Sequence, residues 1–283
     1  MSDPEGLLLV DKPGGMTSHD VVDVVRRRLG TRKVGHAGTL DPMATGLLVL
    51  GVGRATRLLR FLGVLPKTYE GTARLGVETT TLDADGDVTL ERPVTATEAE
   101  VRKAMASLVG GSMQLPPAYS AVKVGGRKLY DAARRGEVLE AAPHRIHVDA
   151  FDLLAMRGPD VDFRVTCSGG TYVRVLLADV GSAVGSGAHL TSLRRTTIGA
   201  LDVIEAVEPA LVDTLLPLER AVAHLPRLEL SPEEAIAASH GRILGPAGLT
   251  GPYAVFALRG PLIGIYEDEG TKARPQVILA PPA

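Results

Sequence analysis

Residues 34–46 bring together one histidine, one aspartate and three glycines: His36, Asp41, Gly35, Gly38 and Gly46. A segment with so little side-chain bulk can approach a bound molecule closely, while a single carboxylate projects from it. A carboxylate in that setting can act as a nucleophile or as a general acid or base. The segment also fits a structural role, because an Asp followed by a Pro is typical of the first turn of a helix.

Two basic clusters point to an anionic partner. The first cluster contains Arg26, Arg27, Arg28, Arg32 and Lys33. The second lies in residues 118–140, where Tyr119 and Tyr130 are interleaved with Lys123, Arg127, Lys128, Arg134 and Arg135. Basic and aromatic side chains on a Gly-hinged segment suit an RNA loop, through phosphate contacts and base stacking. The first cluster also fits a solvated helix end, because cations favour the last turn of a helix.

The net charge of the chain hides this distribution. The chain has 31 Lys or Arg and 33 Asp or Glu, a net charge of −2, which alone argues against a nucleic-acid partner. Residues 1–195 carry 25 basic and 22 acidic residues, whereas residues 196–283 carry 6 and 11. We therefore expect the RNA contacts on the first 195 residues and expect the acidic C-terminal part to contribute little to affinity.

Several other kinds of site are not supported. Residues 51–56 partly match a dinucleotide-binding loop, but Thr56 stands where the third glycine is required, which disfavours a nucleotide-dependent enzyme. His144 and His147 have no further ligands nearby, so no metal site is expected. The single cysteine, Cys167, excludes an intramolecular disulfide. With no secretory signal and no apolar run of membrane-helix length, we expect a cytoplasmic protein that does not bind membranes.

Hydrophobic spacing predicts the elements that hold these residues. A helix is expected from Ser18, as its N-cap, to Gly30, followed by a long ordered loop over residues 31–46. Alternation over residues 68–76 predicts a half-buried strand with Tyr69 on its apolar face. The other expected elements are a hairpin turn at Asp85, helices from Thr97 to Gly110, from Tyr172 and from Ser231, and strands at 6–10, 161–167, 253–258, 262–266 and 276–279.

Six blocks of sequence carry a resemblance to a known family. They are GLLLVDKPGGMTS at 6–18, GHAGTLDPMATGL at 35–47, KTY, LG and DADG within 67–86, QLPPAYSAVKVGG at 114–126, SGGTYVR at 168–174 and GAHLTSLRR at 187–195. Together they resemble the bacterial tRNA pseudouridine-55 synthases of the TruB type. The blocks follow in the family's order over about 190 residues, whereas the last 60 or so residues match loosely.

The resemblance implies an α+β pseudouridine-synthase fold, in which a mixed, mostly antiparallel central sheet is flanked by helices and loops. It implies a catalytic domain over residues 1–226, an RNA-gripping insertion over about 114–147 and a small β-rich, PUA-like domain over 227–283. The implied activity is the isomerisation of uridine 55 in the T loop of tRNA to pseudouridine, without a cofactor. The base would be flipped into a pocket. We expect a monomer that binds the T stem-loop.

The resemblance also implies roles for individual residues. Asp41 would be the catalytic carboxylate that starts glycosidic cleavage, and Arg174 would pair with it and keep it ionised. Tyr69 would stack on the base and accept or relay a proton, Leu193 would close the pocket, and His36 would fill the space that the flipped base leaves. The other implied substrate contacts are Lys12, Tyr172, Gly38 and Thr39. The expected RNA contacts are Arg26, Arg27, Arg32, Lys33, Lys123, Arg127, Lys128 and Arg134.

Alternatives remain at this point. Tyr69 and Leu193 also suit a sheet core, Arg174 suits an exposed first turn of a helix, and His36 suits a structural hydrogen bond. An RNA-binding or tRNA-folding factor without chemistry is a second class of function, although a pure binder has no need of a carboxylate aimed at an anionic ligand. The residues do not distinguish whether Asp41 attacks C6 or C1′ or promotes a route through a glycal.

Overall fold

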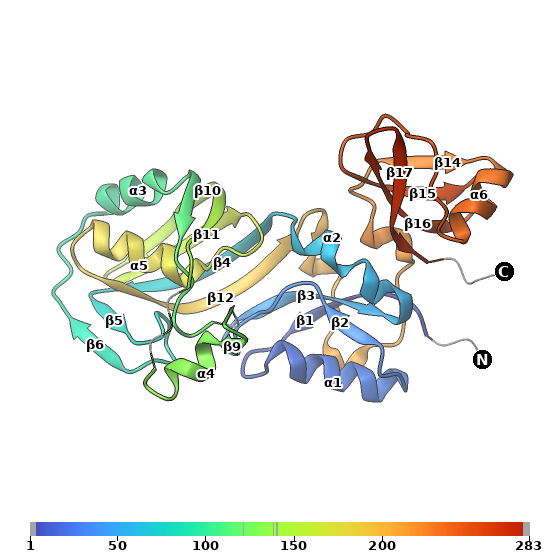
Figure 1. Ribbon diagram of the computed structural model, residues 1–283. Helices are drawn as coiled ribbons and strands as arrows, with labels where there is room; N and C mark the ends of the chain where they lie inside the picture. The colour runs from blue at the N-terminus through green and yellow to red at the C-terminus, as the bar shows by residue number, and fades with distance from the viewer. Residues whose placement is uncertain (1–3, 121, 138, 140, 280–283) are drawn as a thin grey trace.

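The computed structural model, which describes residues 4–279 except 121, 138 and 140, is built on one nine-stranded sheet (Figure 1). Seven strands follow one another in the order β1 (Gly6–Lys12), β3 (Thr45–Val52), β12 (Ala188–Ile198), β4 (Lys67–Leu75), β11 (Asp160–Cys167), β10 (His144–Arg157) and β7 (Gly110–Gln114). Two short strands join its sides: β2 (Val34–His36) pairs with β3, and β13 (Leu201–Asp202) pairs with β12. Only the β3–β12 pair is parallel, so the sheet is mixed and mostly antiparallel, as predicted.

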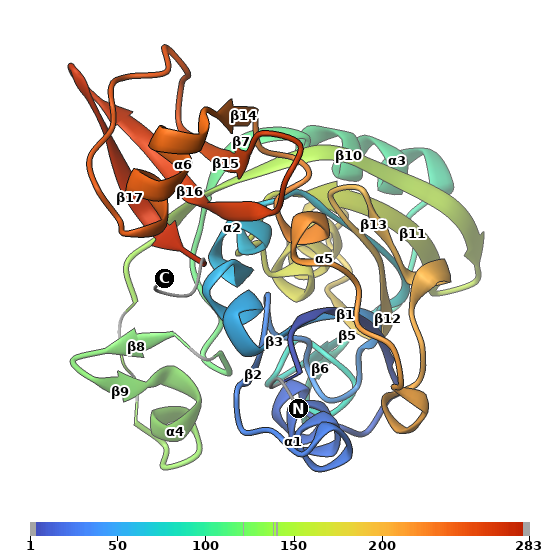
Figure 2. The same cartoon turned by 90° about the vertical axis from the view of Figure 1, so that its right-hand side faces the viewer.

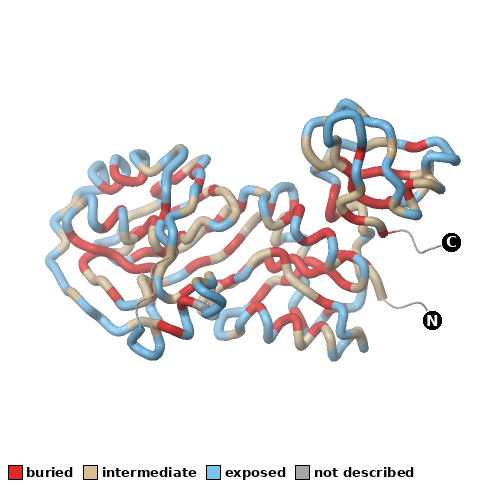
Figure 3. The backbone as a smooth tube through the Cα atoms, viewed as in Figure 1, coloured by how far each residue is buried: buried red, intermediate tan, exposed pale blue. Residues whose placement is uncertain are grey.

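Helices cover the two halves of the sheet separately. Helix α1 (Ser18–Leu29) buries Val21, Val22 and Val25 in a cluster with side chains of β1 and β3. Helices α3 (Glu98–Ser107) and α5 (Val173–Ala183) cover one face of the half formed by β4, β10 and β11. In Figure 3 buried residues run through the central part of the molecule, whereas much of the exposed chain lies at its periphery. The site residues on β4 and α5 are therefore anchored in one packed core.

The N-cap of helix α1 lies one residue earlier in the chain than the sequence predicts. Thr17, not Ser18, is the N-cap: its side chain accepts a hydrogen bond from the backbone N–H of Asp20, which completes a capping box. Ser18 is buried, and its Oγ bonds the backbone N–H and C=O of Leu40 at 2.9 and 3.2 Å. Gly30 ends the helix in the left-handed conformation, as expected.

Four other local expectations need correction. The loop over 31–46 is not continuous, because β2 forms inside it. No helix begins at Asp41, where the chain makes a turn in which the N–H of Ala44 donates to the Asp41 carbonyl. The hairpin of β5 (Val77–Thr79) and β6 (Val88–Glu91) has a loop longer than a tight two-residue turn, and α3 ends at Ser107, before Gly110.

The insertion is a small unit in front of the sheet. It contains a two-stranded hairpin, β8 (Lys123–Val124) and β9 (Arg127–Lys128), followed by helix α4 (Leu129–Ala133). The rings of Tyr119 and Tyr130 meet edge to face, with centroids 6.2 Å apart. In Figures 1 and 2 this unit and helix α1 both lie on the lower side of the molecule.

The C-terminal part forms a separate four-stranded sheet. Its elements are β14 (Arg227–Leu230), α6 (Pro232–Ser239), β15 (Pro252–Ala257), β16 (Leu262–Glu269) and β17 (Lys272–Ile278). Strand β14 was not expected, because its sequence, RLEL, is short and half charged. Figure 1 places this sheet on the upper side, away from the insertion.

The C-terminal sheet is fixed to the rest of the molecule. Phe256 and Ile265 share a core cluster with Leu58, which joins the 3₁₀ turn η1 (Gly53–Arg57) to helix α2 (Leu59–Gly63), and with side chains of α2. Three arginines spaced three residues apart donate to main-chain carbonyls of residues 276–279; they are Arg54, Arg57 and Arg60. The boundary at residue 226 stays a prediction.

The connection from β13 to β14 contains three 3₁₀ turns, η2 (Val203–Glu205), η3 (Pro209–Leu211) and η4 (Leu218–Ala221). In the part of the chain that the structure describes, no helix has both the length and the apolar character of a membrane span.

Candidate active site

The backbone around Asp41 is held on both sides by buried groups. Ser18 bonds both main-chain groups of Leu40. Lys12, which is fully buried, donates its Nζ to the carbonyls of Pro42 at 3.2 Å, Pro13 at 2.9 Å and Met16 at 2.6 Å. The Pro42 carbonyl also accepts the N–H of Gly15 at 2.9 Å. The turn that carries the carboxylate is therefore fixed before any ligand arrives.

The Asp41 carboxylate meets the guanidinium of Arg174. The distance from Arg174 Nε to Asp41 Oδ2 is 3.0 Å, and the side chains are 5% and 37% exposed, respectively. Arg174 lies in the first turn of α5 and is buried, so an exposed surface role for it is wrong. A buried cation near a helix N-terminus is favourable only with nearby carboxylates, which Asp41 supplies from the loop.

A second carboxylate holds the same arginine from the other side. Asp83 is buried, and its Oδ2 lies 3.2 Å from Nη1 of Arg174. The remaining donors of the guanidinium reach main-chain carbonyls, Nη1 to Thr81 at 2.7 Å and Nη2 to Tyr119 at 3.0 Å. Arg174 thereby joins the Asp41 loop, the β5–β6 hairpin and the insertion through one planar group.

The environment of Asp41 disfavours its ionised form. Burial raises the pKa of this carboxyl above its ordinary value, and the nearby charges of Asp83 and Asp85 act in the same direction. Arg174 and Lys12 lower the pKa of Asp41 but do not cancel the effect. The site thus holds a carboxylate that is poorly solvated and oriented by an arginine, which suits nucleophilic attack or proton transfer.

This environment predicts a pH dependence. A raised pKa means that Asp41 loses its charge at a higher pH than an ordinary aspartate, so the rate of the chemical step falls as pH drops through that raised value. Removing the exposed Asp85 charge by Asp85→Asn should move this acid limb to lower pH, because less repulsion opposes ionisation. Single-turnover rates across the acid range measure it. An acid limb that stays in place or moves to higher pH contradicts this account of the site.

Tyr69 and Leu193 lie in the cluster of buried side chains next to Asp41. Both belong to the core that includes Leu40 and Ala44, which flank the Asp41 turn. Burial raises the pKa of Tyr69, so its hydroxyl keeps its proton near neutral pH. This state favours proton donation or relay over direct acceptance. A core role and a substrate role are compatible for both residues.

His36 and Lys12 lie on two further strands, β2 and β1. His36 is on β2, and burial lowers the pKa of its ring, which is therefore neutral near pH 7. Burial also lowers the pKa of Lys12 to about 8, although the nearby Asp41 charge raises it. The structure places Lys12 as a support of the loop.

The three remaining predicted substrate contacts are less central. Tyr172 is the N-cap of α5, its main-chain N–H and C=O both bond the Gln114 side chain, and its ring meets His144 edge to face. Gly38 has a positive φ of 108°, and Thr39 beside it is exposed.

The predicted RNA contacts divide into two groups. In α1, Arg26 is half-buried between Asp23 and the Val34 carbonyl, at 3.1 Å from each, whereas Arg27 is exposed. Arg32 and Lys33, which follow the helix, are exposed as well. In the insertion the side chain of Lys128 lies outside the described part. The other three residues, Lys123, Arg127 and Arg134, are exposed. Arg127 pairs with Glu137, and the guanidinium of Arg134 lies over the Tyr130 ring.

Two buried site residues, Asp83 and Arg195, have no predicted role. Asp83 lies in the DADG block, in which only the hairpin turn at Asp85 was predicted. Arg195 ends the GAHLTSLRR block; it is buried and donates to main-chain carbonyls on the Asp41 loop. Hydrophobic patterning does not find either residue, because a charge in a core is disfavoured unless tertiary contacts pay for it.

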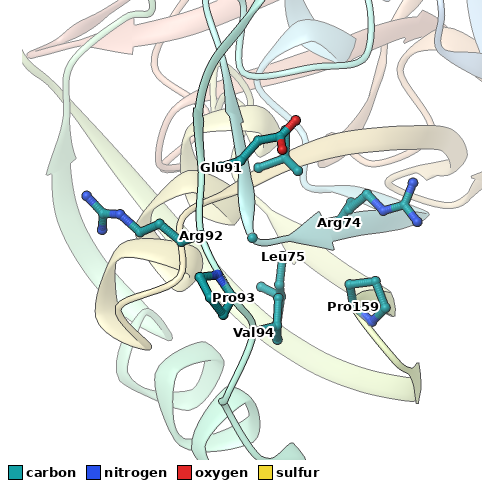
Figure 4. Close-up of a pocket in the computed structure, with 9 residues that line it drawn as sticks. Arg74, Leu75, Glu91, Arg92, Pro93, Val94 and Pro159 are labelled. Atoms are coloured by element: carbon teal, nitrogen blue, oxygen red, sulfur yellow. The ribbon is translucent and has the colours of Figure 1, made fainter.

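Two surface pockets lie outside the group formed by Asp41, Tyr69 and Arg174. One of about 540 Å³ borders the site, because Met43 and Leu193 help to line it. The other, of about 400 Å³, lies at the end of β4, where Arg74 and Arg92 flank it from opposite sides (Figure 4). Neither is lined by Asp41, Tyr69 or Arg174. Within the described ranges no group of His, Cys, Asp or Glu is arranged to hold a metal ion.

Comparison with known structures supports the fold. A structure described as a Cbf5-Nop10-Gar1 complex contains a chain that is 27% identical, with a TM-score of 0.74, over 98% of this chain and 84% of that one. A chain of an H/ACA RNP bound to a substrate RNA containing 2′-deoxyuridine has the same TM-score at 24% identity, over 98% and 86% of the two chains. The second likeness concerns the fold alone.

Comparison with known sequences identifies the family. Residues 26–173 match the TruB family pseudouridylate synthase N-terminal domain, and residues 225–280 match the tRNA pseudouridine synthase II C-terminal domain. The tRNA pseudouridine synthase B of Mycobacterium sp. (strain KMS) is 48% identical over 98% of this chain and 96% of its own length. That of Thermobifida fusca (strain YX) is 46% identical over 98% and 99%. The chain belongs to the TruB family of tRNA pseudouridine synthases, which are isomerases that act on RNA.

Proposed function

We propose that the protein isomerises uridine 55 in the T loop of tRNA, with Asp41 as the catalytic carboxylate. The observation that carries the proposal is the Asp41–Arg174 pair, in which a partly accessible carboxylate is held at 3.0 Å by a buried arginine. The T stem-loop is the proposed substrate because the relatives are named for tRNA and because the Asp41 loop matches the segment that the sequence resemblance places at this chemistry.

The reaction needs only bond exchange within the nucleotide. The N1–C1′ bond breaks, the detached base turns, C5 bonds to C1′, and the C5 hydrogen leaves as a proton while N1 gains one. Asp41 starts cleavage, Arg174 holds its carboxylate in place, and the Tyr69 hydroxyl relays a proton. The base must first leave the stacked loop, at a cost of a few kcal/mol. Leu193 closes the pocket and His36 occupies the space left in the loop.

We infer that RNA lies along the side that carries helix α1 and the insertion. Helix α1 and the insertion are on this side in both views, whereas the C-terminal sheet is on the other (Figures 1 and 2). Phosphate contacts from Arg27, Arg32 and Lys123 suit such a path, since all three are exposed. The acidic C-terminal part therefore contributes little to T-loop affinity.

Position mapping tests the proposed activity. An unmodified tRNA transcript is incubated with the protein, and pseudouridine is located by carbodiimide labelling and primer extension. We expect a single new stop at uridine 55 and none in a matched transcript with cytidine at that position. Modification at another uridine, with position 55 untouched, contradicts the proposed substrate.

Binding of tRNA is expected to protect the insertion from trypsin. Arg127 and Arg134 are exposed on a Gly-hinged unit, which RNA should order through phosphate contacts and stacking. Cleavage at these sites should slow by about tenfold with saturating tRNA. Arg259, exposed at a turn of the C-terminal sheet, serves as the internal control and should be cut at the same rate. Equal rates at Arg127 with and without tRNA contradict the expectation.

A further inference from the structure

A buried arginine beside the Asp41 loop donates hydrogen bonds to three main-chain carbonyls. Arg195 is 1% exposed near the end of β12. Its Nε donates to the Leu47 carbonyl at 2.7 Å, and its terminal nitrogens lie 3.2 Å from the Gly38 carbonyl and 3.5 Å from the Thr39 carbonyl. The ion pairs found within the described residues include no carboxylate bound to Arg195. Three carbonyls of one loop and strand thus share this guanidinium.

Burying a charged side chain in order to hold a loop is unfavourable in free energy. Taking an ion out of water is unfavourable unless a carboxylate compensates it, and neutral donors could satisfy the same carbonyls. Lys67, also buried, adds to the cost, because burial and, to a smaller extent, the repulsion of Arg195 lower the pKa of Lys67 to about 8. Lys67 donates to the carbonyls of Gly63 and Leu65 at the end of α2, not to the Asp41 loop. Stability alone therefore does not explain Arg195.

The position of Arg195 connects the two elements that bear the reacting groups. On β12 it stands opposite Tyr69 of β4 and, on its other side, opposite Gly46 of β3. Gly46 has a φ of 97°, and a Cβ there would lie 2.3 Å from the Arg195 carbonyl oxygen, so only glycine lets these strands come together. Gly38 and Thr39, which Arg195 bonds, precede Asp41 by three and two residues. A hydrogen bond from Arg195 also lowers the pKa of Tyr69, against the effect of burial.

We propose that Arg195 is a positioning residue for the isomerisation, fixing the loop that carries Asp41 relative to the strand that carries Tyr69. The inference rests on the proposed roles of these two residues. Arg195 forms no bond to the substrate. It keeps the carboxylate and the hydroxyl at a set separation on the two sides of the base, and misplacement by about 1 Å can slow an enzyme by about 100-fold.

The test compares Arg195→Met with Lys67→Met as the matched control. Both substitutions remove a buried cation that bonds main-chain carbonyls, but only the first removes hydrogen bonds to the Asp41 loop. For each we measure the single-turnover rate, the dissociation constant of the T stem-loop and the urea midpoint of unfolding. Arg195→Met should slow the rate by about 100-fold, while binding stays within about threefold. Lys67→Met should stay within about threefold in rate at a similar loss of stability.

Arg195→Lys keeps the charge but cannot span three carbonyls, and it serves if Arg195→Met does not fold. It should lose about tenfold or more in rate with unchanged binding. The proposal is overturned if either Arg195 variant keeps a rate within threefold of the wild type, or if Lys67→Met is slowed as much as Arg195→Met. The rates are measured at whichever uridine the wild type converts, so the comparison remains valid if that uridine is not at position 55.

Discussion

Replacing Arg174 with methionine is expected to destabilise the protein by about 3–5 kcal/mol, because the buried carboxylate of Asp83 loses its counterion. The same change removes the donor that orients Asp41, so the rate should fall by about 100-fold or more. Urea unfolding followed by circular dichroism measures the stability, since the chain has no tryptophan to report by fluorescence.

A second substitution separates these two effects. In Arg174→Met with Asp83→Asn the buried charge is gone, so stability should recover with a coupling energy of about 0.5–3 kcal/mol. The rate should not recover, because Asp41 still lacks its arginine. Additive losses in stability would show that the two side chains do not act as a pair.

Asp41→Asn is expected to slow the single-turnover reaction by about 10⁴-fold or more, because the amide has nearly the same shape but cannot act as a nucleophile or base. Binding of the T stem-loop should stay within about threefold of the wild type, because the side chain projects from a loop held by Ser18 and Lys12. The rate is followed by release of tritium from C5 of uridine.

Asp160→Asn is the matched control for Asp41→Asn. Asp160 also pairs with an arginine, Arg74, at 3.4 Å, but both side chains are well exposed. An exposed pair of this kind contributes about 0–1 kcal/mol, so the control should keep wild-type stability and rate. Similar losses in the two variants would rule out a special role for Asp41.

Where a helix or strand carries its own capping box or its own alternation of apolar residues, the sequence predicted it in most cases. The capping box at Thr97 and the one at Ser231 both form, and the alternation around Tyr69 gives a strand with that ring buried. Helix α1 shows the limit of such reasoning. Thr17 and Ser18 are both competent caps, and the choice depends on Leu40, which lies 22 residues further along.

Two long strands were not predicted because their alternation is broken. Strand β12 pairs with β4 through two irregularities, and its buried face includes Arg195, whose charge is satisfied only by distant carbonyls. Strand β10 has similar shifts in register near Val148 and Leu153. A bulge moves the following side chains to the other face, so a strict period of two fails in the sequence.

In the candidate site too, some residues were predicted from the sequence and others were not. The sequence resemblance pointed to Asp41 and Arg174, which are 133 residues apart in the chain and which the fold brings to 3.0 Å. It did not assign Asp83 or Arg195, because the need for each arises only when Arg174 and the loop are packed together. A charged side chain is tolerated in the core only where the fold supplies partners for it, and no local sequence pattern contains those partners.

The most direct test of the account uses a T stem-loop with C5-tritiated uridine only at position 55. Forming the C5–C1′ bond must expel the hydrogen on C5. We predict that the wild type releases one equivalent of tritium, whereas Asp41→Asn, bound to the same RNA, releases none. Retention of tritium by the wild type, or release at the same rate by Asp41→Asn, would contradict the account.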